Sequence, residues 1–407
     1  MRRGTSLRAG GLLALALGLT LGLAAPALAA PALAATDPGA SLPGPVGDCP
    51  STRGVAAPKS APWAQQALGF TSVWPLTRGA GVTVAVVDSG VDANPQFGTR
   101  FTEGLNLAPA TMGVPAGADC VGHGTSVASI IAAAPAPGVS FTGVAPAARV
   151  LSVKITNSDS FPGSLAAQAI RAAVAAGAQV INLSLATTVS TPELAAAVQF
   201  AEASNVVVVA AAGNDSSSSG SGPFFPAAYP GVLSVGAVAP DGSLATFSDT
   251  HTPVSVTAPG VGVTAAYPGV FPEAYNPASN GTSFATAFVS GTVALVRAAH
   301  PDLTQSQVVA RIEATADGGS GPGTGHGLIN PVQAVTAVLP ATSPGAATAA
   351  PPAGKVQIDR APRPDRAASS IALPVAAGAG GVAALVIAAA IVVPAGRRRH
   401  WHPGPQR

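Results

Sequence analysis

Short runs of β-branched apolar residues alternate with alanine-rich stretches through the middle of this 407-residue chain. Runs so uniformly apolar are typical of strands buried on both faces of a sheet, and strands that alternate with helices form parallel βαβ units. We therefore predict an α/β fold of three layers, with helices on both faces of a mostly parallel central sheet. The predicted strands are 82–87, 150–155, 180–185 and 206–212, and the predicted helices include 164–177 and 192–204.

The N-terminus has the features of an export signal. Arginines follow the first methionine, an apolar run covers residues 11–25, and A-x-A patterns end at Ala29 and Ala34. A positive start, a short apolar run and a small-residue cleavage site predict a secretory signal peptide over residues 1–35. The alternative is an uncleaved anchor, which a run this short and so rich in Pro and Ala disfavours.

A second apolar segment lies near the C-terminus. Residues 371–393 carry no charge, and a helix of that length would extend about 34 Å, enough to cross a bilayer. Three arginines follow at 397–399, and positive residues at one end of a span place that end in the cytoplasm. We predict a single-pass protein of the cell membrane whose body lies outside, with 394–407 as a cytoplasmic tail. The alternative is an alanine-rich helix of a buried core.

The segment before this span has a different composition. Residues 340–370 are rich in Pro, Ala, Ser and Thr and show no apolar periodicity. Such a composition is typical of an extended linker. At about 3.1 Å per residue, it could hold the folded part as far as about 90 Å from the membrane.

Charge is distributed unevenly along the chain. Residues 79–337 contain six Arg and Lys against 14 Asp and Glu, a net charge of −8, although the whole chain carries +2. An acidic region is a poor binder of nucleic acid or anionic lipid, which argues against nucleic acid as a partner.

Only two cysteines occur, Cys49 and Cys120. In an exported chain an even number predicts a disulfide, with free thiols or metal ligation as alternatives. The sequence has no CxxC motif, no Cys/His cluster and no clear calcium loop, so we expect neither a metal nor a cofactor.

Asp88 and His123 are the first two candidate catalytic residues. Asp88 ends the first predicted strand, where α/β folds expose functional side chains, and a carboxylate after six apolar residues needs a partner. It could instead cap a turn, and Asp92 is its local competitor. His123 lies between Gly122 and Gly124 at a predicted helix start, which raises a catalytic role above the usual structural one. Three other histidines lie in loop-like contexts and rank lower: His251, His300 and His326.

Ser283 and Asn214 complete the candidate set. Ser283 follows Gly281 at the start of a long apolar helix, where backbone N–H groups and the helix dipole can stabilise an oxyanion. Asn214 ends the strand VVVVAAAGN and could supply a second oxyanion donor. Read alone, Gly-Thr-Ser is an ordinary helix cap and the asparagine a left-handed turn residue.

The order of these motifs is more specific than any one of them. Asp, His and Ser, with Asn between the last two, follow the order found in subtilisin. The strings DSGV, GHGTSVA, AAAGN and NGTSFAT resemble the signatures of the subtilases, and GVAPAARVLSVKI and VINLSLA resemble internal strands of that family. The resemblance covers about 79–337 and implies a subtilisin-like fold and serine endopeptidase activity on proteins or peptides.

The same resemblance implies a role for each site residue. Ser283 would be the nucleophile, His123 the base and Asp88 its orienting acid, while Asn214 would help to hold the oxyanion. Two extended segments, 184–186 and 210–212, would bind the substrate peptide as an added strand. Because Ala186 stands where the family usually has Gly, we expect a narrow first pocket that takes a small or medium apolar residue. The implied substrate-binding residues are Ser184, Leu185, Ala186, Ala210, Ala211, Ala212, Phe224 and Phe225.

The flanking sequences narrow the resemblance to the mycosins, membrane-anchored proteases that accompany type VII secretion systems. Residues 62–95, the export signal and the C-terminal span resemble that group. The resemblance implies that residues 36–78 are an extension wrapping a peptidase domain at 79–339, tied by a Cys49–Cys120 disulfide. The extension is too short and Pro-rich for a folded inhibitory propeptide, so we expect it to be permanent.

The mycosin resemblance also implies substrates and a partner. The substrates would be proteins exported by a type VII system, and the partner would be its membrane complex. An alternative function is that of a structural stabiliser whose proteolysis is dispensable. A general scavenging protease is a third alternative, which the anchor and short charged tail disfavour. The intact triad favours an active enzyme.

Overall fold

The computed structural model describes residues 54–108, 118–156, 163–215, 222–319 and 321–339. All of these residues belong to one compact unit. The predicted signal peptide, linker, membrane span and tail lie outside the described residues, as does Cys49.

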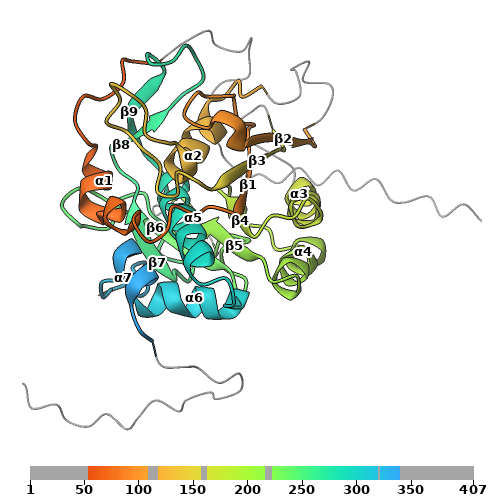
Figure 1. Ribbon diagram of the computed structural model, residues 1–407. Coiled ribbons are helices and arrows are strands. Elements are labelled where there is room, and N and C mark those ends of the chain that lie inside the picture. Colours follow the sequence, from red (N-terminus) through yellow and green to blue (C-terminus); the bar gives the residue numbers. More distant parts are fainter. Residues whose placement is uncertain (1–53, 109–117, 157–162, 216–221, 320, 340–407) are drawn as a thin grey trace, which may run out of the picture. The chain divides into compact units, whose positions relative to one another are not determined.

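A seven-stranded parallel sheet forms the middle layer of the described unit (Figure 1). Its strand order is β2-β3-β1-β4-β5-β6-β7. The four predicted strands are present as β1 (Thr83–Asp88), β3 (Arg149–Lys154), β4 (Val180–Leu183) and β5 (Val207–Ala211). Three further strands were not predicted from the sequence: β2 (Phe101–Asn106), β6 (Leu233–Val238) and β7 (Val256–Pro259).

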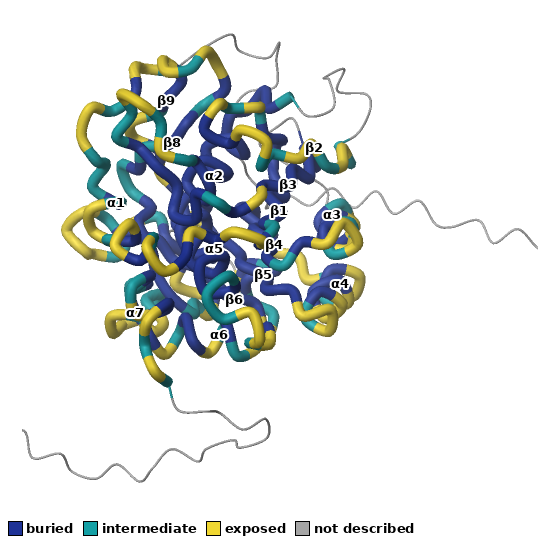
Figure 2. The backbone as a smooth tube through the Cα atoms, viewed as in Figure 1, coloured by how far each residue is buried: buried dark blue, intermediate teal, exposed yellow. Residues whose placement is uncertain are grey.

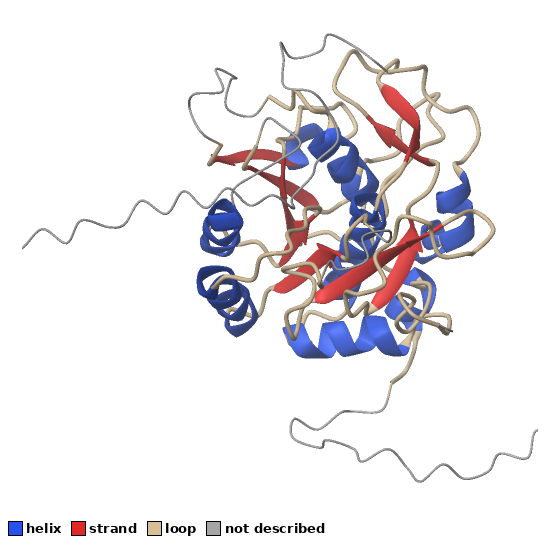
Figure 3. Cartoon of the chain, turned by 180° about the vertical axis from the view of Figure 1, so that it is seen from behind, coloured by secondary structure: helices blue, strands red, loops and turns tan. Residues whose placement is uncertain are grey.

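Helices cover both faces of this sheet (Figures 1 and 3). Along β1, Val84 and Val86 lie in one apolar cluster and Ala85 and Val87 in the other, as the two-residue period of a strand requires. Helices contribute residues to both clusters, which confirms the predicted three layers. Helices α2 (His123–Ala132) and α5 (Thr282–Ala299) lie on the first face together with shorter helices, and α3 (Gly163–Ala175) and α4 (Pro192–Ala203) lie on the second.

Helix α5 is the central helix of the described unit. Every residue from Thr282 to Arg297 is buried, as the dark tube in Figure 2 shows. Among the described residues, α5 alone is long and apolar enough to cross a membrane, but 89% of its apolar window is buried. A helix that is apolar all round and enclosed by protein is a core helix. It is not the predicted span at 371–393.

The remaining elements surround this core. A small antiparallel hairpin joins β8 (Val263–Ala266) to β9 (Tyr275–Ser279). The short helices are α1 (Trp63–Leu68), η1 (Phe70–Val73), η2 (Gly98–Arg100), α6 (Gln305–Ala314) and α7 (Pro331–Thr336).

The described part of the N-terminal extension packs into the main core. Phe70 is fully buried in the same apolar cluster as α2 and α5. Val55 pairs with Tyr275 through two backbone hydrogen bonds of 2.8 and 3.1 Å, so the extension adds to the β8–β9 hairpin. The predicted boundary at residue 79 is therefore not a packing boundary.

Strand β1 lies where the strand order reverses, with β3 and β2 on one side and β4 to β7 on the other. Open α/β sheets bind ligands outside the carboxyl ends of their strands at such a point. Asp88 is the last residue of β1, Ser184 follows β4, and Asn214 follows β5. Helices α2 and α5 both begin at this edge.

Candidate active site

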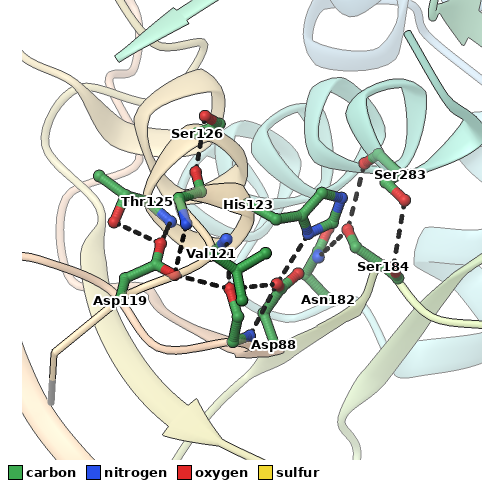
Figure 4. Close-up of polar contacts among 12 residues, drawn as sticks. Asp88, Asp119, Val121, His123, Thr125, Ser126, Asn182, Ser184 and Ser283 are labelled. Atoms are coloured by element: carbon green, nitrogen blue, oxygen red, sulfur yellow. Dashed lines mark hydrogen bonds and ion pairs between the residues drawn. The ribbon is translucent and has the colours of Figure 1, made fainter. Parts of the chain in front are cut away.

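Asp88 and His123 form a buried pair at the carboxyl end of β1. Nδ1 of His123 lies 2.7 Å from Oδ1 of Asp88, which also accepts the Ser89 N–H at 2.8 Å. An ionised carboxylate only accepts hydrogen bonds, so Nδ1 carries the proton and Nε2 has the free lone pair. In Figure 4 the imidazole lies between the Asp88 carboxylate and Ser283. Oδ2 of Asp88 is buried without a hydrogen-bond partner among the described residues.

Two glycines let His123 approach this carboxylate, as the sequence suggested. A Cβ on Gly124 would lie 2.0 Å from the Gly90 carbonyl oxygen, so only a glycine lets α2 approach the end of β1 this closely. Gly122 has φ +83°, and a Cβ there would lie 2.2 Å from the Tyr267 ring. His123 is the first residue of α2 and is almost fully buried.

The pKa of His123 is shifted by opposing effects. Burial disfavours the charged imidazolium and lowers the pKa, but the charge and hydrogen bond of Asp88, and then the charge of Asp119, raise it. The net result is a pKa above the ordinary value for histidine. The site therefore favours the protonated imidazolium that general-base catalysis forms transiently.

Ser283 is fixed against the end of β4 by reciprocal hydrogen bonds. Its Oγ donates to the Ser184 carbonyl at 3.1 Å, and the Ser184 Oγ donates to the Ser283 carbonyl at 3.1 Å. Behind them, Ser290 donates to Asn182 at 2.9 Å, and Asn182 donates to the Ser184 Oγ at 2.7 Å. All four side chains are buried, so this polar chain holds the start of α5 at one place on the sheet.

Asn214 is exposed and is oriented by the first residue of α5. Its Oδ1 accepts the Thr282 N–H at 2.9 Å and the Thr282 hydroxyl at 2.8 Å, which leaves Nδ2 as the outward donor. The Ser283 N–H belongs to the first turn of α5, where N–H groups have no carbonyl one turn before them. A left-handed turn at Asn214 is excluded, because Asn205 is the one described non-glycine residue with positive φ.

The predicted substrate-binding segments lie beside these groups. In both segments the side chains are buried except that of Ala186, which is partly exposed, so peptide binding there would use mainly backbone atoms. Phe224 packs on Gly213, where a Cβ would lie 2.4 Å from its ring. Phe225 pairs with Thr187 through two backbone hydrogen bonds of 2.7 and 3.0 Å. Of the two phenylalanines, Phe224 is therefore the one against the strand that leads to Asn214.

The other candidate residues are held elsewhere. His251 pairs with Asp249 at 3.1 Å, and Nε2 of His300 lies 2.8 Å from the Val335 carbonyl oxygen. His326 donates its backbone N–H to Ser255. Within the described ranges, no group of three His, Cys, Asp or Glu side chains could hold a metal ion. Cys120 is buried, and its disulfide with Cys49 stays a prediction.

Sequence reasoning missed a buried charged cluster behind the imidazole. Asp119 and Lys154 are buried there, and Lys154 donates to the Ala118 carbonyl. Burial raises the pKa of Asp119, although hydrogen bonds from Thr125 and Ser89 oppose this shift. Burial lowers the pKa of Lys154, although the charges of Asp119 and Asp92 oppose that shift. Asp119 lies four residues before His123, but nothing in that spacing indicates its contacts.

Comparisons with known proteins agree with this geometry. Residues 79–335 match the subtilase family. Mycosin-1 of Mycobacterium tuberculosis is 35% identical over 386 residues, covering 79% of this chain and 84% of the relative. The crystal structure of MycP1 from Mycobacterium smegmatis aligns with a TM-score of 0.61 and 31% identity over 72% of this chain and 90% of that one. A structure described as the serine protease MycP1, an essential component of the type VII (ESX-1) secretion system, aligns with a TM-score of 0.60 and 34% identity over 73% and 96%.

Proposed function

The chain belongs to the subtilase family, and within it to the mycosins, and from this premise we propose that Asp88, His123 and Ser283 are the catalytic triad of a serine endopeptidase. Membership of this family makes the chain a serine protease. The observation that carries the assignment is the 2.7 Å pairing of His123 with the buried Asp88, at the sheet edge where α5 begins.

Acylation begins at the Ser283 hydroxyl. In the structure this hydroxyl donates to the Ser184 carbonyl, so it must turn toward Nε2 of His123 when substrate binds. Oγ then attacks the scissile carbonyl carbon while Nε2 takes the proton, and Asp88 stabilises the imidazolium. The imidazolium gives its proton to the leaving amine as the C–N bond breaks. Water, activated by His123, then hydrolyses the acyl-enzyme.

The oxyanion of each tetrahedral intermediate is held by two donors. One is Nδ2 of Asn214, whose amide is fixed by the two hydrogen bonds from Thr282. The other is the Ser283 N–H at the positive end of α5. Because Thr282 orients the Asn214 amide without substrate, the developing negative charge would meet a dipole that needs little reorganisation.

The substrate is a peptide bound along 184–186 and 210–212, with a small or medium apolar residue before the cut. The methyl group of Ala186 and the ring of Phe224 support a narrow pocket. A peptide-library profile tests this preference. A profile dominated by Lys or Arg at that position would contradict it.

We infer that the protein is anchored by residues 371–393, faces outward and cleaves proteins exported by a type VII secretion system. The mycosin relatives support this setting, and one of their solved members is described as an essential component of such a system. On the same ground we infer that the chain also supports the secretion complex. The extension at 36–78, tied by Cys49 and Cys120, would stay attached to the mature enzyme.

Labelling of the full-length protein with a fluorophosphonate tests the triad. We expect one covalent adduct, located on Ser283 by mass spectrometry, and no adduct in Ser283→Ala. Labelling at another serine, or equal labelling of the variant, would refute the assignment. Secretion in cells that carry Ser283→Ala separates the two roles, because a pure stabiliser would keep secretion normal.

A further inference from the structure

Asp119 is a buried carboxylate to which the proposed mechanism gives no role. Its Oδ1 accepts the Ser89 hydroxyl and the Gly122 N–H, both at 2.8 Å. Its Oδ2 accepts the Thr125 N–H at 2.8 Å and the Thr125 hydroxyl at 2.7 Å. Because an N–H group can only donate, the Gly122 and Thr125 N–H groups place one fixed donor on each oxygen, which favours the ionised carboxylate against the effect of burial, which raises its pKa.

These four hydrogen bonds connect the surroundings of both members of the buried pair (Figure 4). Ser89 directly follows Asp88, and its hydroxyl also accepts the Gly124 N–H at 3.1 Å. Gly122 precedes His123, and Thr125 follows it by two residues. One side chain therefore holds the loop after Asp88 and the backbone on both sides of His123.

Asp119 also serves the start of α2, which has no capping side chain of its own. The N-cap residue is Gly122, and the first helical N–H groups lack intrahelical partners. The Thr125 N–H is the third of these, and it is satisfied by Asp119. A negative charge at this end of a helix is favourable and opposes the effect of the helix dipole on a cationic His123.

Few other charges face His123. From β1 comes Asp88, and from the loop before α2 comes Asp119. Lys154, at the end of β3, interacts with Asp119 and Asp92. It does not contribute to the pKa shift of His123.

Among the described residues, the other elements that contact the imidazole or its loop do so through uncharged groups. The Phe284 ring from α5 lies 5.4 Å from the His123 ring, centroid to centroid. The Tyr267 hydroxyl, in the loop after β8, donates to the Val121 carbonyl at 2.8 Å. Asp119 is thus the second anion, after Asp88, that stabilises a charged His123.

We propose that Asp119 is a positioning residue of the active site, whose ionised carboxylate fixes the first turn of α2 against the loop after Asp88 and stabilises the His123 imidazolium during turnover. The inference rests on the proposed triad.

The test compares Asp119→Asn with Asp92→Asn in the full-length protein. Asp92 is the control, because it is a partly buried carboxylate of the same cluster and accepts the Asp119 N–H at 2.8 Å. The readout is kcat/KM against pH on a fluorogenic peptide with alanine before the cut. For Asp119→Asn we expect kcat to fall about 10- to 100-fold, with a smaller change in KM. The acidic limb of the pH profile, where kcat/KM falls as His123 becomes protonated, should move to lower pH by about half to one unit. For Asp92→Asn the limb should stay in place.

A direct titration of His123 tests the pKa shift without measuring catalysis. In a Ser283→Ala background labelled with ¹⁵N-histidine, the His123 resonances are assigned by their loss in His123→Ala. Asp119→Asn should lower the His123 pKa in the same direction as the acidic limb. A folded Asp119→Asn protein with unchanged pKa and unchanged acidic limb would overturn the inference.

A second pair of variants keeps the test decisive if Asp119→Asn does not fold. Thr125→Val and Ser89→Ala each remove one hydroxyl donor and keep the charge. Each should lower kcat by about 3- to 10-fold without moving the acidic limb, and wild-type kcat in both would overturn the positioning role. Fluorophosphonate labelling distinguishes a failure of the proposed triad from a failure of the inference about Asp119. An unlabelled wild type would refute the triad, whereas a labelled wild type with an unmoved limb in Asp119→Asn would refute this inference alone.

Discussion

The two halves of the proposed active site are built from different kinds of groups. The half at the end of β1 and the start of α2 is charged and buried, and its centre is the pair of Asp88 and His123 with Asp119 behind it. In the half at the ends of β4 and β5 and the start of α5, which we call the neutral half, the proposed catalytic groups carry no charge. There Ser283 and Asn214 are held by hydroxyl, amide and backbone hydrogen bonds.

The difference follows from what each half must stabilise. The charged half must accommodate a proton on a buried imidazole, which is unfavourable without a permanent anion beside it. The neutral half must stabilise an oxyanion that exists only briefly, and oriented dipoles do so without needing a counter-charge when the site is empty. Changes in the charged half should therefore alter both rate and pH dependence, and changes in the neutral half should alter the rate alone.

The largest effect is expected for His123→Ala, which removes the base from the charged half. We expect kcat to fall about 10⁶-fold, a magnitude that comes from a subtilisin, a relative of this chain. Any residual activity should lack the acidic limb of the pH profile. A residual rate that still shows the wild-type limb would mean that another group is titrating.

Asp88→Asn should be the next largest. An amide can donate to Nδ1, which favours the wrong imidazole tautomer, and a loss of about 10⁴-fold in kcat is expected. In the wild type the pKa of His123 is raised, so activity should decline as pH falls through a value above about 6.5. Without the Asp88 anion this decline should occur at lower pH. A pH profile of kcat/KM measures both effects, and a limb that moves upward would contradict the account.

Asn214→Ala tests the neutral half. Removing one oxyanion donor should lower kcat about 10²- to 10³-fold, again a magnitude known from subtilisin, with KM within a few-fold of wild type. The acidic limb should stay at its wild-type pH, because no charge is removed. Thr282→Val is a milder control, since it removes one of the two donors that orient the amide. A shifted limb in Asn214→Ala would break the distinction between the halves.

The smallest effect is expected for Ala186→Gly at the edge of the neutral half. Loss of the methyl group should widen the first pocket and improve kcat/KM for a larger apolar residue before the cut by up to about tenfold. The ratio of kcat/KM for substrates with leucine and alanine at that position measures the change. An unchanged ratio would show that Ala186 does not line the pocket.

The sequence predicted those parts of the fold that local patterns determine. Strands β1 and β5 are apolar and rich in β-branched residues, and their predicted positions are confirmed to within one residue at each end. Strand β2 reads FTEGLN and is mostly exposed at the sheet edge, and β7 is only VTAP, so neither has an apolar pattern to detect. Pairing of Val55 with Tyr275 joins segments more than 200 residues apart and leaves no local signal.

The candidate site was predictable to a similar extent. Asp88, His123 and Ser283 were predicted from their order and from their expected places at the ends of elements, and the structure has them at such places. Asp119 could not, because its importance comes from donors on a different strand end and on the first turn of α2. The bond from the Ser283 hydroxyl to the Ser184 carbonyl was also not predictable, since it depends on how α5 meets β4.

The proposed mechanism requires Asp88, His123 and Ser283 to act as one unit. The most direct test is the second-order rate constant for fluorophosphonate addition to Ser283 in the wild type, Asp88→Asn, His123→Ala and the double variant. Residues that act through one another are strongly non-additive, so the double variant should react no more than a few-fold slower than His123→Ala. A loss in the double variant equal to the product of the two single losses would contradict the account.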